Sequence, residues 1–356
     1  MNRALVKRIA DAVLYEGYIL YPYRPSIKNH QRWTFGGLYP EAHCRAVDNG
    51  ETSSNQTECL VRGTSATSIE VVVRFLHLTD RIVGEVLPPL AEWPRDTEPP
   101  FRSVPMLRIG EQQWHAWQEA EECEVSLGDV TLDTLSAAPR CVPFWFPGGR
   151  RSEPVRDAAG MIGGVLIRQQ QAIKGVLEIK AVEVAAELFR LTCRVMNRTP
   201  PQGTASESRE EALLRCLVSA HTILGVREGE FVSLLDPPAC WSETAAACQN
   251  VGTWPVLIGA AGQTADTMLS SPIILYDYPQ VAAESPGDFF DGTEMDEMLT
   301  LRILTLTDEE KLAMTAVDER ARDLLLRTET MAQEQFRGLH GTIRDPRTLP
   351  QEEAHG

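Results

Sequence analysis

The sequence lacks the short motifs by which many enzymes and metal proteins are recognised. Its 356 residues contain no GxSxG, no GxxxxGK, no GxGxxG after a strand and no HExxH. The eight cysteines form no CxxC or CxxH pair and have no framework-like spacing, so neither a zinc ribbon nor a disulfide scaffold is indicated. We expect most of these cysteines to be buried as small hydrophobic residues, and we identify no catalytic residue.

Long apolar runs are absent too. No segment approaches the ~18 to 20 apolar residues that a membrane helix requires. The opening stretch MNRALVKRIADAVLYEGYIL is basic like a signal peptide, but Asp11 and Glu16 interrupt its apolar part and no small-residue cleavage site follows. We therefore expect no membrane span and a cytoplasmic protein.

Basic residues are fewer than acidic ones. Lys and Arg number 34 against 50 Asp and Glu, which gives a net charge of -16. This balance argues against a nucleic-acid partner, because phosphate binding needs a positive surface. The 43% hydrophobic and 24% charged content is that of a globular chain, and its length leaves room for two domains.

The first of these domains is predicted over residues 11–200 and is rich in β-strands. Apolar residues alternate from Leu177 to Ala181 and again, after a turn, at Leu188, Leu191, Cys193 and Val195, which predicts two long antiparallel strands with one face in a core. Segments 57–62 and 68–78 are predicted to form a hairpin around Gly63. The pattern favours an antiparallel β-sandwich or half-barrel. The acidic cluster Glu119, Glu121, Glu122 and Glu124 is interpreted as a solvated face.

A smaller α/β domain is predicted over residues 206–341, so that the fold class is α+β. Ser208 and Glu211 have the spacing of a capping box, and apolar residues at helical spacing continue to Leu224. Strands are predicted at 254–258 and 271–278, followed by terminal helices. Residues 342–356 are rich in charge and proline and are predicted to be a disordered tail.

The segment 277–297 is the most unusual stretch of the chain. It contains seven carboxylates and no Lys, Arg or His. Oxygen ligands at this density suit a hard divalent cation, although the spacing is not that of a twelve-residue calcium loop. A partner-facing or solvated loop and pairing with arginines elsewhere are the alternatives. The candidate metal ligands are Asp277, Asp288, Asp291 and Glu294, of which the last three are also candidate partner contacts.

A second candidate surface is the stretch CVPFWFPGGRR, from Cys141 to Arg151. Aromatic and arginine side chains contribute much of the binding energy at protein interfaces. A buried hairpin corner is the alternative interpretation. The candidate partner-binding residues are Phe144, Trp145, Arg150 and Arg151. The adjacent pair His43 and Cys44 has ligand types that suit nickel, but two neighbours rarely form a site, so we interpret the pair as structural.

Three stretches carry a family resemblance. They are DAVLYEGYILYPYRPSIKNHQRWTFGGLYP, DPPACWSETAAACQNVGTWPVLIG and SSPIILYDYPQVAAESPGDFFDGTEMDEMLTLRILTLTDEEK. Together they resemble an accessory protein family encoded with the high-affinity, actinobacterial-type nickel-iron hydrogenases. The resemblance covers both ends and the C-terminal half, and it fades between about Arg45 and Val165. It implies a role in hydrogenase maturation or assembly by genetic association, and it brings no catalytic residues with it.

The sequence therefore favours a non-enzymatic cytoplasmic accessory factor that binds a hydrogenase subunit or another maturation protein. No cofactor is predicted. One alternative is a metal-dependent hydrolase or ligase that uses the acidic loop 277–297 to hold a divalent metal. The other is a β-sandwich module that carries a ligand in a pocket lined by Trp33, Trp114 and Trp145.

Overall fold

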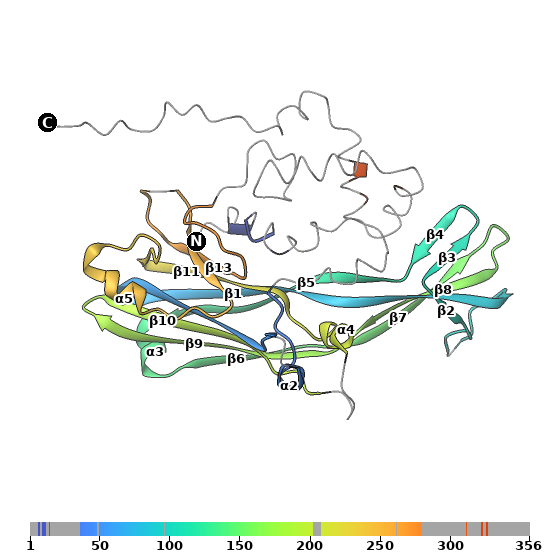
Figure 1. Ribbon diagram of the computed structural model, residues 1–356, viewed down its shortest axis with the longest axis horizontal. Helices are drawn as coiled ribbons and strands as arrows, with labels where there is room; N and C mark the ends of the chain where they lie inside the picture. The colour runs from blue at the N-terminus through green and yellow to red at the C-terminus, as the bar shows by residue number, and fades with distance from the viewer. Residues whose placement is uncertain are drawn as a thin grey trace, which may run out of the picture.

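The structure, a computed structural model, describes residues 6–7, 9–11, 14, 36–47, 50–95, 97–201, 208–260, 262–279, 311, 322 and 325–326. Within them, eleven strands form one antiparallel sheet and two more form a separate hairpin (Figure 1). The strands are β1 (Ser54–Leu90), β2 (Arg102–Val104), β3 (Met106–Ile109), β4 (Gln112–His115), β5 (Trp117–Thr131), β6 (Arg140–Phe146), β7 (Gly149–Arg156), β8 (Ile162–Gln170), β9 (Ile173–Ala185), β10 (Leu188–Asn197), β11 (Val218–Val232), β12 (Trp254–Ile258) and β13 (Thr267–Ser271). The short helices are α2 (Glu41–Ala46), α3 (Leu132–Ala137), α4 (Arg209–Leu213), the 3-10 turn η2 (Ala239–Trp241) and α5 (Ser242–Ala246).

Strand β1 organises the sheet, because it is 37 residues long and has hydrogen-bonded neighbours along both edges. Residues 60–62 pair with both β10 and β11, so these two strands lie on opposite edges of β1. Residues 79–81 pair in the same way with both β5 and β8. It follows that β10, β5 and β2 succeed one another along one edge, and β11 and β8 along the other.

A β-bulge stands where a hairpin is predicted around Gly63. Residues 64–67 of β1 lie opposite the single residue Glu228 of β11. The hydroxyl of Thr67 accepts a hydrogen bond from the Thr64 amide (2.9 Å) and donates one to the Glu228 carbonyl (2.7 Å), which closes the bulge. The chain then continues in the same direction. The predicted hairpin is wrong because a glycine followed by small polar residues marks a bulge as well as a turn.

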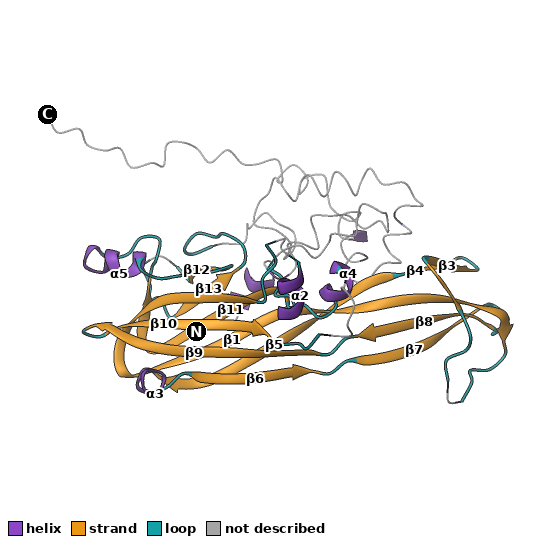
Figure 2. Ribbon diagram, turned by 60° about the horizontal axis from the view of Figure 1, so that its bottom comes forward, coloured by secondary structure: helices purple, strands orange, loops and turns teal. Residues whose placement is uncertain are grey.

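The segments 140–156 and 162–185 form one long two-stranded ribbon, in which β6 pairs with β9 and β7 with β8. Strand β8 lies beside the C-terminal part of β1, whereas β9 joins β10 beside the N-terminal part. The ribbon therefore crosses over β1, and β6 and β9 form a second layer (Figure 2). The predicted N-terminal antiparallel β architecture is confirmed.

The main core lies between these two layers. Side chains of β1 and β5 meet those of β9 and β10 there, and helix α3 packs against them. The predicted alternation of β9 and β10 is confirmed for six of its seven apolar residues, which face this core. They are Leu177, Ile179, Ala181, Leu191, Cys193 and Val195. The seventh, Leu188, is buried in a separate cluster with Leu60 and Val232.

After residue 208 the chain returns to the same sheet. Ser208 and Glu211 form the predicted capping box, but α4 ends at Leu213 and the chain is extended from Val218 onward. The helix predicted to continue to Leu224 is wrong, because pairing of β11 with β1 overrides local helix propensity. Strands β13 and β12 add to β11 in turn, so the boundary predicted near residues 200–206 does not separate two sheets.

The strand predicted at 271–278 is displaced toward the N-terminus. Strand β13 ends at Ser271, and Pro272, which has no amide hydrogen to donate, begins an irregular segment. Strand β12 matches its prediction. The predicted terminal helices fall outside the described residues except at a few positions, and the tail 342–356 falls outside them entirely. Among the described residues, no helix has the length and apolar character needed to cross a membrane.

Candidate functional site

Strand β6 separates the two aromatic residues that were predicted to act together. Side chains alternate along a strand, so Phe144 points into the core and Trp145 points outward. The centroid of the Phe144 ring lies 6.1 Å from that of Phe75, and a Cβ on Gly175 would collide with the same ring. Trp145 is 62% exposed. Of this pair, Trp145 is the one that a partner can reach, and Phe144 contributes to the core.

An open hollow of about 640 Å³ lies beside Trp145. Its lining residues are Trp145, Ala172, Lys174, Thr199 and Pro200. Trp114 packs elsewhere, in an apolar cluster with Val83 and Leu107, and Trp33 lies outside the described residues. The two described tryptophans of the predicted ligand pocket therefore do not line a common cavity.

Arg150 is tied to the segment that precedes β2. Its Nε and Nη2 donate to the two oxygens of Glu98 at 2.7 and 2.8 Å, and its Nη1 donates to Gln169 at 2.6 Å. Hydrogen bonds from Arg150 and Ser152 lower the pKa of Glu98 to about 2. Arg151 is exposed and makes no ion pair with the other described residues. Arg150 thus fastens a loop to β7, and Arg151 stays open to solvent.

Asp277, the first carboxylate of the acidic stretch, holds the following segment against β12 through hydrogen bonds. Its Oδ1 accepts a hydrogen bond from the Leu257 amide at 2.7 Å, and its Oδ2 accepts one from the Ser233 hydroxyl at 2.5 Å. The amide of the next residue, Tyr278, donates to the Leu257 carbonyl at 2.7 Å. These bonds cover the outer edge of β12, so both carboxylate oxygens of Asp277 already have partners.

The other acidic candidates, Asp288, Asp291 and Glu294, lie outside the described residues, and their roles stay predictions. In the part of the chain that the structure describes, no three His, Cys, Asp or Glu side chains are grouped as a metal ion would require.

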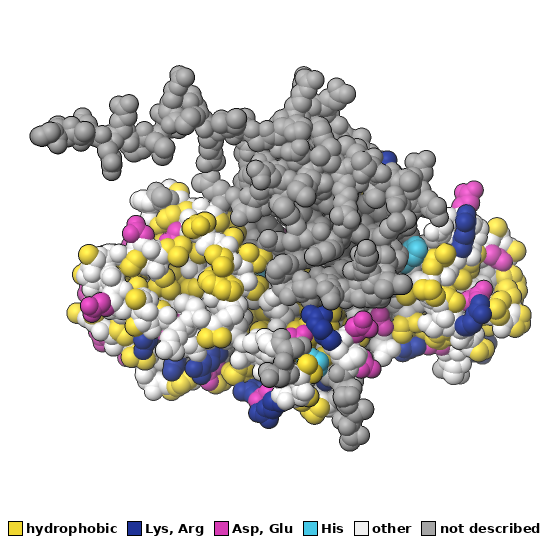
Figure 3. Space-filling model, in the orientation of Figure 1, with side chains coloured by type: hydrophobic (Ala, Val, Ile, Leu, Met, Phe, Trp, Pro, Cys, Tyr) yellow, Lys and Arg dark blue, Asp and Glu magenta, His cyan; other side chains and the backbone are white. Residues whose placement is uncertain are grey.

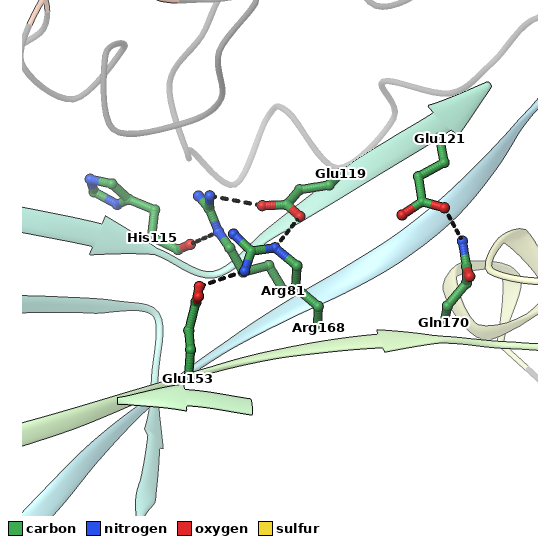
Figure 4. A network of polar contacts seen from close by, with 7 residues as sticks. All are labelled: Arg81, His115, Glu119, Glu121, Glu153, Arg168 and Gln170. Atoms are coloured by element: carbon green, nitrogen blue, oxygen red, sulfur yellow. Dashed lines mark hydrogen bonds and ion pairs between the residues drawn. The ribbon is translucent and has the colours of Figure 1, made fainter. Parts of the chain in front are cut away.

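Four charged side chains form a chain of ion pairs across β5, β1, β8 and β7 (Figure 4). Arg81 and Arg168 donate to the two oxygens of Glu119 at 3.0 and 2.7 Å, and Arg168 also donates to Glu153 at 2.5 Å. Arg81 further donates to the carbonyl of His115 at 3.0 Å. Two positive and two negative charges cancel. The interpretation of the acidic cluster on β5 as a solvated face is therefore wrong for Glu119.

His115 borders this network, and His77 lies on β1 four residues before Arg81. Burial lowers the pKa of His77 and of His115, and the charge of Arg81 lowers the pKa of His115 further. The Nε2 of His77 lies 2.8 Å from the carbonyl oxygen of Gln171, whereas the buried Nε2 of His115 has no hydrogen-bond partner among the described residues. A lowered pKa favours the neutral form of both imidazoles at neutral pH.

The pair His43 and Cys44 has the structural role expected of it. The Nε2 of His43 lies 2.8 Å from one oxygen of Glu51, and Arg209 donates to the other oxygen at 2.7 Å. The buried His43 ring stacks on Tyr39 with 5.4 Å between centroids. These contacts hold α2 against the chain near α4.

The cysteines are more varied than predicted. Cys59, Cys193 and Cys216 are buried, and burial raises the pKa of Cys193 to about 12. Cys141 and Cys240 are exposed. The expectation of buried cysteines therefore holds for part of the set.

Prediction from the sequence missed a group of basic side chains on the outer face of β9 and β10. Residues 173–181 of β9 and 189–195 of β10 place their odd-numbered side chains in the core, so the even-numbered ones lie on the opposite face, where Leu188 and Thr192 are themselves buried. Basic residues at even-numbered intervals, six in one strand and four in the other, were the available signal, because an even spacing places them on one face of a strand. We call this set the basic face. It consists of Lys174, Lys180, Arg190, Arg194 and Arg198.

Comparison with known proteins adds no relative. No protein-family model matches the chain, and no curated protein matches it.

Proposed function

We propose that the protein is a cytoplasmic accessory factor that acts by binding another protein, and that this partner is a subunit or a maturation protein of a nickel-iron hydrogenase. The partner's identity comes from the three stretches that resemble the hydrogenase-associated family. Such a resemblance is an association and carries no chemistry of its own. The binding activity is supported by one structural observation, the exposure of Trp145.

Trp145 has the properties of a binding anchor. A large aromatic side chain that is 62% exposed stands on a strand whose neighbouring aromatic residues, Phe144 and Phe146, pack against the core. Tryptophan is among the residues that contribute most to protein interfaces. Because β6 is hydrogen-bonded to β9 and anchored by those two rings, the backbone at Trp145 is already ordered before binding. The hollow beside it leaves room for a partner side chain.

Charged residues are proposed to assist this anchor. Arg151 is exposed and is proposed as a contact, together with the carboxylates of the acidic stretch, Asp288, Asp291 and Glu294. Exposed charges at an interface raise the association rate and select partners more than they add affinity. The proposal therefore assigns affinity to Trp145 and selection to the charged residues.

Affinity purification of the tagged protein from its own host, grown while the hydrogenase is expressed, tests the proposal when combined with mass spectrometry. We expect a hydrogenase subunit or maturation protein with the wild type, and a recovery about tenfold lower with Trp145→Ala. Trp254→Ala is the matched control, since Trp254 is a tryptophan 42% exposed on β12. Recovery of no hydrogenase-related protein by the wild type contradicts the proposed partner. Equal recovery by the two variants contradicts the role of Trp145.

A further inference from the structure

The basic face has the opposite sign to the chain as a whole. Arg190, Arg194 and Arg198 each form an ion pair, with Glu58, Glu178 and Glu41 respectively. Lys174 and Lys180 make up the local excess of positive charge, whereas the net charge of the chain is -16. Figure 3 shows Lys and Arg side chains, with Asp and Glu among them, along the lower left border of the molecule, where Figure 1 places α3 and β6 below β9 and β10. A local excess of positive charge on an acidic protein attracts anionic groups to that face.

The two lysines of the basic face are available to a ligand. Lys174 and Lys180 make no ion pair with the other described residues. Arg194, between them in space, is oriented by a hydrogen bond from its Nε to Gln56 at 2.6 Å, and its Nη1 lies 3.8 Å from Glu178. The face therefore combines mobile ammonium groups with a guanidinium group held in a fixed orientation, a combination that suits carboxylates.

An apolar strip crosses the same face. Pro143, Val176 and Met196 lie side by side on β6, β9 and β10. They are two residues along the strands from Trp145 and Lys174, which face each other on β6 and β9. Val176 and Met196 are partly exposed. A ligand on this face therefore meets an aromatic plane and an apolar strip with positive charges on both sides.

We propose that the basic face, with Trp145 at one end, binds an acidic segment of a partner polypeptide. The inference rests on the proposed function and names the chemistry of the partner. Carboxylates of the segment pair with Lys174 and Lys180, and an apolar side chain enters the hollow beside Trp145. Nucleic acid fits this surface less well. Proteins that bind single strands stack successive bases on several aromatic residues, and Trp145 is the one aromatic residue at the outward positions of β6, β9 and β10 within the described structure.

The spacing of the two lysines sets the length of the segment. Lys180 follows Lys174 by six positions on β9, which is roughly 20 Å at about 3.3 Å per residue. An extended partner segment of about six residues therefore spans both lysines.

Fluorescence anisotropy with a labelled peptide of about ten residues, rich in Asp and Glu around a central Leu, tests this inference. We expect the wild type to bind the peptide and the double variant Lys174→Glu/Lys180→Glu to bind it at least about tenfold more weakly. The matched control is Arg95→Glu/Arg108→Glu, which changes the net charge equally at two exposed arginines, in the loop after β1 and on β3. We expect the control to bind within about twofold of the wild type.

Four outcomes overturn the inference. They are no binding by the wild type, an equal loss in the control, tighter binding of single-stranded oligothymidylate that the lysine variant abolishes, and a wild-type dimer in sedimentation that the lysine variant abolishes. The last two would assign the face to nucleic acid or to a second copy of this chain. Circular dichroism of each variant establishes that it is folded.

The same lysine variant separates this inference from the proposed function when it is used in the affinity purification. If it recovers a hydrogenase protein as well as the wild type does, the inference fails and the proposed function stands. If the wild type recovers no hydrogenase protein while charge reversal still abolishes peptide binding, the proposed function fails and the inference stands.

Discussion

Arg81 and Arg168 lie directly opposite each other on β1 and β8, and the carboxylate of Glu119 on β5 binds both. Like charges that face each other across two strands repel, so this pairing depends on the carboxylate between them. The side chains of Arg81 and Glu119 are 7% and 22% exposed, where solvent screens charges less than it does at the surface. Glu119 therefore links β5 to two strands at once.

Removing the charge of Glu119 should destabilise the protein strongly. Glu119→Gln leaves two facing guanidinium groups without their shared carboxylate, and we expect the free energy of unfolding to fall by about 3 kcal/mol. Urea denaturation followed by circular dichroism measures the change. Glu124→Gln, an exposed glutamate on the same strand, is the control and should change stability by less than about 0.5 kcal/mol. Equal unfolding midpoints for Glu119→Gln and the wild type would show that the network adds no stability.

Stability should depend on pH through Glu98. Its folded-state pKa of about 2 lies below the ordinary value of 4.5, because Arg150 and Ser152 donate hydrogen bonds to its ionised form. A depressed pKa contributes stability above pH 4.5, and that contribution is lost as the pH falls toward 2. Because Glu98 and Arg150 lie near the surface, we expect the contribution of ionised Glu98 to the free energy of unfolding to be under about 1 kcal/mol. The wild type should therefore exceed Glu98→Gln in melting temperature at pH 6 and lose that advantage near pH 2.

Nuclear magnetic resonance titration of the Glu98 side-chain carboxyl gives an independent check. A midpoint near the ordinary glutamate value would contradict the bidentate contact with Arg150. In Arg150→Gln the midpoint should rise toward that value, because the main cause of the shift is then removed.

Local sequence patterns predicted the strands whose neighbours are close in the chain. The alternation from Leu177 to Val195 identified β9 and β10, because each strand packs one face on the core and they are joined by a tight turn. The capping box was also correct, since it depends only on Ser208 and Glu211, three positions apart. The local pattern could not predict that the helix ends at Leu213. The chain becomes extended there because β11 pairs with β1, about 150 residues earlier in the sequence.

The sequence predicted only part of the candidate site, because strand register and pairing between distant segments cannot be read from local patterns. The sequence singled out Trp145, which is exposed, but did not show that Phe144 points the other way, because the start and register of β6 were not known. It missed the basic face because Lys174 and Arg198 lie 24 positions apart in the sequence. The hairpin of β9 and β10 brings them together, with the Arg198 amide donating to the Lys174 carbonyl at 2.8 Å.

Packing of Phe144 over Gly175 should make that glycine hard to replace. A Cβ at Gly175 would lie 2.1 Å from the Phe144 ring and 2.8 Å from the carbonyl oxygen of Met196, so the ring and the backbone would both have to move. We expect Gly175→Ala to destabilise the protein by about 2 kcal/mol in urea denaturation. Gly128→Ala is the control, because its Cβ would meet no atom within 4 Å, and it should be neutral or slightly stabilising. Equal stability of the two variants would mean that Phe144 does not pack on β9.

Asp277 separates a structural role from a metal-binding role within the acidic stretch. Asp277→Ala removes the acceptor for the Leu257 amide and the Ser233 hydroxyl, and we expect a loss of about 1 to 3 kcal/mol in unfolding free energy without any added metal. Asp277→Asn keeps one acceptor oxygen and should lose less. If the contact is structural, treatment with a chelator leaves the melting temperature of the wild type unchanged. A wild-type melting temperature that falls with chelator and recovers with a divalent cation, in a way that Asp277→Ala abolishes, would instead make Asp277 a metal ligand and revive the predicted acidic metal site.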